Sequence, residues 1–243
     1  MFHIRSLDGV IERRLLINFR VRPDALARFL PPPFAPQLVN GWGMAGICLI
    51  RLGQVRPRGL PPMCGFSSEN AAHRVAVTWL ENDRQRRGVY IPRRDTSSAM
   101  NLALGGRSFP GVHHRALFSV TDSRDHLTIV MRSLDLVARV EVEGHPIARL
   151  SPGSVFASLA EASDFFRGGS VGFSATDRCD CHESVRLITE RWSVEPLAVE
   201  HVESSFFGDR GLFAAGTVEF DSALIMRNVP CCWRAEPPLR AAA

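Results

Sequence analysis

The sequence predicts an α+β fold in which antiparallel β-sheet predominates, built as a single domain over residues 1–243. Three observations indicate this. Most apolar segments are short and alternate apolar with polar residues, as strands do when one face is buried. Helical periodicity is confined to about three short segments. The regular strand–helix alternation of a parallel α/β sheet is missing, and no linker rich in proline, glycine or serine divides the chain.

In the first half of the chain, Val10 to Val21 reads as a strand with apolar and polar residues on both of its faces. Pro23 to Leu30 reads as a short helix, because proline is favoured at the first helical position, and Pro31-Pro32-Pro33 ends it. The further expected strands are 37–40, 44–55, 71–80 and 89–92, separated by a proline-rich loop at 56–63 and a charged turn at 81–88.

In the second half, Thr96-Ser97-Ser98 offers hydroxyl caps for a helix through Leu104 that Gly105-Gly106 ends. An amphipathic helix is expected over Ser154 to Phe166. The remaining expected strands are 113–120, 126–134, 136–142, 184–194 and 217–226, with 197–207 open between strand and helix and an arginine- and proline-rich tail after 226.

The absence of lysine among the basic residues excludes several kinds of enzyme chemistry. All 29 residues counted as lysine or arginine are arginines, against 25 acidic residues, which gives a net charge of +4. Without lysine there is no side-chain Schiff base, no pyridoxal phosphate anchor and no P-loop lysine. We expect no cofactor. The arginines are spread along the chain instead of massed, so a nucleic-acid partner is not expected.

The cysteines and the apolar runs point to a reducing, cytoplasmic location with free thiols. The N-terminal residues do not begin a signal peptide, and no apolar run approaches the ~20 residues that span a bilayer, so no membrane association is expected. Cys179-Asp180-Cys181-His182 resembles part of a zinc site, but Cys231-Cys232 is too tightly spaced to complete one. We therefore predict no metal.

The densest polar stretch, Tyr90 to Ser98, contains Arg93-Arg94-Asp95 directly before a predicted helix. Arginine binds a carboxylate or phosphate through two parallel hydrogen bonds. Arg93 is thus a candidate substrate-binding residue. The alternative is that Asp95 caps the helix and the arginines lie in solvent.

A second polar stretch runs from Phe109 to Arg115. On a strand, His113 and Arg115 share one face and His114 takes the other. A histidine beside an arginine is easier to keep neutral, which suits a general base. His113 is therefore a candidate base and Arg115 a candidate substrate contact, against the alternative of a hydrogen-bonded structural histidine.

Two further candidates come from strand-like segments. Glu69, Ala71 and His73 share one face of a predicted strand, so the carboxylate and the imidazole can form an acid/base pair or a substrate clamp. The alternative is a surface ladder of polar residues. Glu203 lies in an otherwise apolar segment and is a candidate substrate contact.

Several short motifs resemble the acetoacetate decarboxylase superfamily. These are Leu30-Pro31-Pro32-Pro33-Phe34 after the short helix, Gly106-Arg107-Ser108-Phe109-Pro110, and Leu197 to Ser205. Over nearly its whole length the chain more closely resembles a branch of that superfamily made of domains of unknown function. The stretches that carry this second resemblance are 65–70, 87–98, 109–115 and 153–159.

The resemblance implies a strongly bent antiparallel sheet, wrapped as a cone or barrel around a pocket, with a few short peripheral helices. In acetoacetate decarboxylase, a lysine in that pocket forms a Schiff base. This sequence departs there: Gly111-Val112-His113-His114 follows Pro110, and Pro92-Arg93-Arg94 stands where another register places Pro-Lys-Lys. Arginine stays protonated and is no nucleophile, so a Schiff-base decarboxylase is excluded.

The sequence therefore predicts a small-molecule enzyme of lyase, isomerase or cyclase type, acting on a carbonyl or carboxylate compound by acid–base chemistry. In this prediction Arg93 or Arg107 holds the anion, His113 is the base, and Glu69 with His73 is the opposing pair. The alternative is a protein that binds a small molecule in the same cavity without turnover. The oligomeric state stays open, a homodimer through the cone edges and helix 154–166 being compatible with the sequence.

Overall fold

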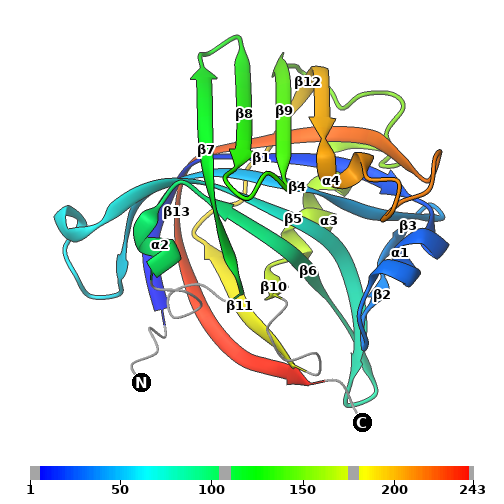
Figure 1. Cartoon of the computed structure of the whole chain (residues 1–243), viewed down its shortest axis with the longest axis horizontal. Coiled ribbons are helices and arrows are strands. Elements are labelled where there is room, and N and C mark those ends of the chain that lie inside the picture. Colours follow the sequence, from blue (N-terminus) through cyan, green and yellow to red (C-terminus); the bar gives the residue numbers. More distant parts are fainter. Residues whose placement is uncertain (1–5, 104–110, 175–180, 241–243) are drawn as a thin grey trace.

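The computed structural model describes residues 6–103, 111–174 and 181–240. Within them, thirteen strands form one strongly curved sheet, and four short α-helices and one 3-10 turn lie around it (Figure 1). Most strand pairs are antiparallel; β6 pairs in parallel with β7 and with β10. The predicted α+β fold with a bent, mainly antiparallel sheet is confirmed. None of the described helices is long and apolar enough to cross a membrane.

The strands are β1 (Ser6–Val21), β2 (Ala35–Pro36), β3 (Leu38–Val39), β4 (Trp42–Pro57), β5 (Phe66–Glu81), β6 (Arg84–Thr96), β7 (His113–Asp122), β8 (Leu127–Ser133), β9 (Arg139–Pro146), β10 (Val171–Ser174), β11 (Cys181–Thr189), β12 (Glu195–Ser204) and β13 (Val218–Arg240). The helices are α1 (Pro23–Phe29), α2 (Ala99–Ala103), α3 (Leu159–Gly168) and α4 (Ser205–Gly208), and the 3-10 turn is Pro62–Cys64.

The strand pairings close into two rings that share five strands. The shared strands β13, β1, β4, β5 and β6 follow one another in the sheet. On one side β10 and β11 link β6 back to β13, and on the other side β7, β8, β9 and β12 do the same. Figure 1 shows these two groups on opposite sides of the long shared strands. Because both faces of the shared strands lie inside a ring, both are buried over much of their length.

Each ring has its own apolar core, because successive residues of a strand point to opposite faces. In β1, Leu15 and Ile17 belong to the core of the β7–β9 and β12 ring, whereas Leu16 belongs to the core on the β10–β11 side. The first core is filled by side chains from β8 and β9 and by Phe207 of α4. The second is covered by Phe166 of α3. The same alternation decides which polar residues of the shared strands face which ring.

The structure corrects several predicted boundaries. The charged segment 81–88 is not a long turn: β5 and β6 continue to a two-residue turn at Asn82 and Asp83, both with positive φ, a conformation that asparagine and aspartate tolerate. The tail after residue 226 is also strand, because β13 pairs first with β1 and then with β11 up to Arg240. Long-range pairing here overrides the local proline content.

The remaining differences concern short elements. The helix expected from residue 154 begins at Leu159, because Ser158 caps it by accepting the Glu161 backbone N–H. The segment 197–207, left open between two states, is strand β12 followed directly by α4. The strand expected at 136–142 is β9, shifted to residues 139–146, and β10 was not predicted. A four-residue parallel strand carries too little sequence pattern to be recognised.

Candidate functional site

A cavity of about 510 Å³ lies inside the ring formed with β10 and β11. This volume falls within the range of about 300–1,000 Å³ typical of small-molecule sites. Its walls come from β1, β4, β5, β6, β11 and β13, and from α3. The exposed residues Arg167, Glu190 and Arg191 also line it, so the cavity communicates with solvent at that end.

Three arginines from the shared strands line this cavity: Arg14 of β1, Arg74 of β5 and Arg94 of β6. The register brings them together, because Arg94 is paired with Ala72, two residues before Arg74 on β5. Gly46 of β4 lies between β1 and Arg74, and a Cβ atom there would come 3.3 Å from Nη2 of Arg74. A glycine at this position leaves room for the guanidinium.

The three guanidiniums lack anionic partners. Nη1 of Arg14, Nε of Arg74 and Nη2 of Arg94 are buried without a hydrogen-bond acceptor. Among the residues that the structure describes, no carboxylate forms an ion pair with any of the three. Burial lowers the pKa of Arg74 and of Arg94 to about 10, so both remain cations at neutral pH. Buried charges normally have a partner, so this cluster is suited to an anionic ligand.

The contacts that the arginines do make hold them in place. Arg74 donates to the side-chain oxygen of Asn18, and its guanidinium lies 4.9 Å from the ring centre of Phe166. Arg94 donates from Nε to Oγ of Ser174 at 3.2 Å. These neutral contacts orient the guanidiniums without cancelling their charge.

His113 lines the same cavity. Its Nδ1 lies 3.1 Å from the carbonyl oxygen of Gly111, which can only accept, so the neutral ring carries its proton on Nδ1 and its lone pair on Nε2. Burial, together with the positive charge of Arg94, lowers the pKa of His113 to about 4. His113 is therefore neutral at physiological pH, as a general base must be.

The rest of the lining is largely apolar and aromatic. Trp192, Trp233 and Phe166 contribute rings, and Arg14 lies with its guanidinium carbon 5.6 Å from the ring centre of Trp192. Oδ1 of Asn101, a residue that is 5% exposed, is a buried acceptor without a donor. Two acidic residues, Asp95 and Glu190, also belong to the lining. With more arginines than acids and with apolar walls, the cavity fits an organic acid better than an inorganic ion.

The predicted pair Glu69 and His73 shares one face of β5, as expected, but that face points away from the cavity. Oε2 of Glu69 lies 2.6 Å from Nη2 of Arg13, in a buried ion pair. His73 has no exposed surface and packs against Phe206, with ring centres 4.7 Å apart. Neither residue belongs to the cavity lining, because the pairing of β5 turns Asn70, Ala72 and Arg74 toward it instead.

The predicted anion-binding residues are also placed differently. Arg93 donates to Asp95 at 2.8 Å and to Asp135 at 2.9 Å, so its charge is already balanced by two carboxylates. Arg115 of β7 is paired with Thr96 of β6 and lies outside the cavity lining. Arg107 lies outside the described residues. Of the Arg93-Arg94 pair, Arg94 is the residue that lines the cavity.

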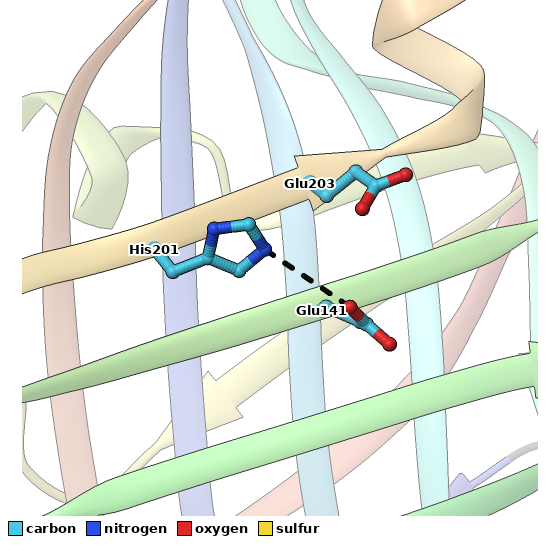
Figure 2. A group of neighbouring side chains, drawn as sticks. All are labelled: Glu141, His201 and Glu203. Atoms are coloured by element: carbon cyan, nitrogen blue, oxygen red, sulfur yellow. Dashed lines mark ion pairs between the residues drawn. The ribbon is translucent and has the colours of Figure 1, made fainter.

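Glu203 lies on the outer side of the other ring (Figure 2). It forms an exposed group with Glu141 and His201, in which Nε2 of His201 lies 4.0 Å from Oε2 of Glu141. Arg139 donates to Glu141 at 2.7 Å. Glu203 lies outside the cavity lining, so the structure does not bring it together with His113, and its role as a substrate contact stays a prediction.

The Cys179–His182 motif is only partly described. Cys179 and Asp180 lie outside the described residues, and His182 has its Nε2 3.1 Å from the carbonyl oxygen of Pro32. The five described cysteines are free thiols, namely Cys48, Cys64, Cys181, Cys231 and Cys232.

Several cavity residues escaped the sequence analysis, above all Arg14, Arg74, Cys48 and Asn101. A weak signal exists for the two arginines, since each interrupts a segment of strongly apolar strand residues. That signal is shared by Arg13, which faces the other ring and pairs with Glu69. Only the pairing of the strands separates the two kinds of arginine.

Residues 10–219 match the model of DUF2071, a family of uncharacterized conserved proteins. The chain belongs to this family. The resemblance to a branch made of domains of unknown function is therefore confirmed. Among curated proteins, no significant sequence match was found.

Solved structures with the same fold are acetoacetate decarboxylases and their relatives. This DUF2071 protein superposes on acetoacetate decarboxylase from Legionella pneumophila with a TM-score of 0.61 at 10% identity, over 96% of this chain and 88% of that one. An acetoacetate decarboxylase-like enzyme from Sphingomonas wittichii also gives 0.61, at 12% identity over 98% and 94%. The enduracididine biosynthesis enzyme MppR, complexed with pyruvate, gives 0.57 at 11% over 98% and 90%. Because the sequence identities are this low, the similarity establishes a shared fold and not a shared activity.

Proposed function

We propose that this DUF2071 protein is a small-molecule enzyme that binds a carbonyl-containing organic acid in the arginine-lined cavity and moves a proton on it, without an amine intermediate. The observation that carries the proposal is the set of three guanidiniums, of Arg14, Arg74 and Arg94, that line one cavity, each with a buried nitrogen and without a described carboxylate partner. A ligand carboxylate would supply the missing acceptors through charge-assisted hydrogen bonds.

The proposed chemistry follows from the position of His113 among these cations. With its proton on Nδ1, neutral His113 can take a proton from the carbon next to the ligand's carbonyl group through Nε2. The negative charge that develops on the carbonyl oxygen would be stabilised by a guanidinium already fixed in place, such as that of Arg94. The resulting enolate can be reprotonated elsewhere or lose a leaving group, so isomerase and lyase reactions are both open to this site.

The relatives of known structure support this class of ligand. One is named as acetoacetate decarboxylase and another was solved with pyruvate; acetoacetate and pyruvate are both acids that contain a carbonyl group. The present chain has no lysine, so a Schiff base on a lysine side chain is excluded, and acid–base chemistry on the bound acid is the route that its residues offer.

The proposal is tested by incubating the protein with short 2-oxo and 3-oxo acids in D₂O and following deuterium incorporation next to the carbonyl by NMR, together with calorimetric titration. We expect binding, and exchange above the rate in buffer. His113→Asn should reduce exchange about 10²-fold or more with the acid still bound, and Arg94→Gln should weaken binding. Arg86→Gln, which removes an exposed guanidinium, is the matched control. Absence of binding to every acid in the series would contradict the proposal.

A second candidate function is binding without turnover in the same cavity. The absence of lysine from a fold shared with acetoacetate decarboxylase favours it. The same experiment separates the two: tight binding with no exchange and no chemical change of any bound acid would assign the cavity to a carrier or sensor.

A further inference from the structure

Cys48 places a thiol among the cavity arginines. Of the five described cysteines, Cys48 lines the cavity, and its exposed fraction is 7%. Nε of Arg14 lies 3.2 Å from its Sγ and donates to it. The sulfur also interacts electrostatically with Arg74 and Arg94, because negative charge on it favours the cationic form of both. The thiol thus accepts a hydrogen bond from one guanidinium and lines the same cavity as the other two.

This environment differs from those of two other cysteines. Cys231 is buried with its thiol directed at the carbonyl oxygen of Gly9, and burial raises its pKa to about 12. Cys64 is exposed at the surface. Positive charge beside a cysteine is a common feature of nucleophilic cysteines, and the hydrogen bond from Arg14 places such a charge at Sγ of Cys48. The proton transfer assigned to His113 makes no use of this sulfur.

A second, independent observation shows that the space beside Cys48 is built for a ligand. Nε of Arg74 is buried and has no acceptor, although the residue is only 4% exposed and lines the cavity. Nη2 of the same guanidinium donates to the side-chain oxygen of Asn18. An anionic oxygen at this nitrogen would lie in the same cavity as the sulfur, so one bound acid can meet both groups.

We propose that Cys48 is a nucleophile that adds to an α,β-unsaturated carboxylic acid held by Arg74 and Arg94. The proposal rests on the acid-binding cavity proposed above and extends it to a covalent step. The sulfur forms a bond to the β-carbon, the electrons of the carbon–carbon double bond move to the α-carbon, and the α-carbon takes up a proton. Overall the S–H group adds across the double bond, so no oxidant or reductant is consumed, and the reverse reaction releases the acid.

The charge of the cavity decides which electrophiles reach the sulfur. Three desolvated cations raise the local concentration of anionic reagents and disfavour cationic ones. A neutral electrophile gains nothing from the guanidiniums. We therefore expect the reactivity of Cys48 to depend on the charge of the reagent, in contrast to that of the exposed Cys64.

The first test compares two alkylating reagents of nearly equal size, anionic iodoacetate and neutral iodoacetamide. In both, the sulfur forms a bond to carbon and iodide leaves. Peptide mass spectrometry gives the rates at Cys48 and at Cys64 in the same sample. We expect the ratio of the iodoacetate rate to the iodoacetamide rate to be about ten times larger at Cys48 than at Cys64. Arg94→Gln and Arg74→Gln should reduce this difference, whereas Arg86→Gln should not.

The second test uses maleate as the unsaturated acid and maleamide as its neutral counterpart. We expect a single maleate adduct on Cys48, little adduct from maleamide, and no adduct at that peptide in Cys48→Ala. A saturating oxo acid that binds the cavity should protect Cys48 from both iodoacetate and maleate. Protection is measured on the unsubstituted protein, so the test does not depend on a variant folding correctly.

The outcomes distinguish this inference from the proposed function. If oxo acids bind but the ratio of the iodoacetate rate to the iodoacetamide rate is no larger at Cys48 than at Cys64, and maleate forms no adduct on Cys48, the nucleophile assignment is overturned and the acid site stands. If Cys48 prefers anions and oxo acids protect it, both are supported. If neither binding nor preferential alkylation occurs, both are overturned.

Discussion

Arg93 and Arg94 are neighbours in β6 and point to opposite faces of the sheet. Nη2 of Arg93 lies 2.8 Å from Asp95 and 2.9 Å from Asp135. Arg94 faces the cavity, where Nε donates to Ser174 at 3.2 Å and Nη2 has no partner among the residues that the structure describes. The first guanidinium completes a buried charge network, and the second is left available to a ligand.

Removing Arg93 should destabilise the protein strongly. In Arg93→Ala, the fully buried carboxylate of Asp95 loses its two hydrogen bonds from the guanidinium. Leaving one member of a buried ion pair unpaired costs about 3–5 kcal/mol of unfolding free energy. Urea denaturation measures the loss. Arg86→Ala, which breaks an exposed pair with Glu81, should cost less than about 1 kcal/mol; equal losses in both variants would refute the buried network.

Removing Arg94 should have the opposite effect on stability. Arg94→Met takes away a desolvated cation that has no anionic partner and keeps a side chain of comparable length. We expect the unfolding free energy to stay the same or to rise by roughly 1 kcal/mol, while oxo-acid binding weakens by about tenfold or more. Thermal denaturation with and without the acid measures both quantities. A marked loss of stability would mean that Arg94 has a structural role.

Glu69 should be important for stability and unimportant for ligand binding. In Glu69→Gln, the buried Arg13 loses its 2.6 Å partner and keeps only Asp122, at 3.3 Å. We expect a loss of about 1–3 kcal/mol, with the dissociation constant for oxo acids unchanged. Calorimetric titration at a temperature well below unfolding checks the second part. A large change in affinity would restore Glu69 as a functional residue.

His73 should make the stability depend on pH. Burial and the charge of Arg93 lower its pKa from 6.5 to about 3. Between these values the unfolded chain binds a proton that the folded protein does not, so stability falls as the pH is lowered through this window, by about 1.4 kcal/mol per pH unit from this group. His113 contributes in the same direction down to about pH 4.

The variant His73→Leu isolates the contribution of this residue. It removes two buried ring nitrogens without partners, so the unfolding free energy at pH 7 should rise by about 1–2 kcal/mol and the slope below pH 6 should become shallower. Denaturant titrations at several pH values give both. The exposed His201→Asn variant serves as the control, and an unchanged slope in His73→Leu would contradict the assignment.

Gly46 should not tolerate a side chain. A Cβ atom at this position would overlap the carbonyl oxygen of Ile17 on β1, so Gly46→Ala must separate two central strands and should cost about 2–3 kcal/mol. At Gly153, a Cβ atom meets nothing within 4 Å, and Gly153→Ala should be close to neutral. Thermal unfolding of the two variants side by side is the measurement.

Local pattern was sufficient for many elements of the fold. The short helix from Pro23 and the strands around residues 10–21, 44–55 and 71–80 follow from proline position and from apolar alternation, which are properties of neighbouring residues. The strand from 227 to 240 was missed because its stability comes from β1 and β11, which are distant in sequence. Hydrogen bonds to two partner strands outweigh its unfavourable local composition.

The candidate site was predicted less completely, because it too depends on the pairing of strands that are distant in sequence. His113 was found because it lies beside an arginine in a polar stretch, and it does line the cavity. Glu69 and His73 do share a face of β5, but alternation along a strand defines two faces without saying which of them meets a ligand. Arg74, one residue beyond His73, is therefore equivalent to it in pattern and opposite in role.

Residue composition and local pattern were enough to exclude lysine chemistry and to predict a sheet-rich fold. A chain without lysine has no lysine amine to form a Schiff base, and alternating apolar residues with few helical segments produce a sheet-rich fold. The tertiary structure alone decided that Arg14, Arg74, Arg94 and Cys48 lie around one cavity. These residues come from four strands, and only the pairing register and the closure of the sheet into rings bring their side chains to a common face.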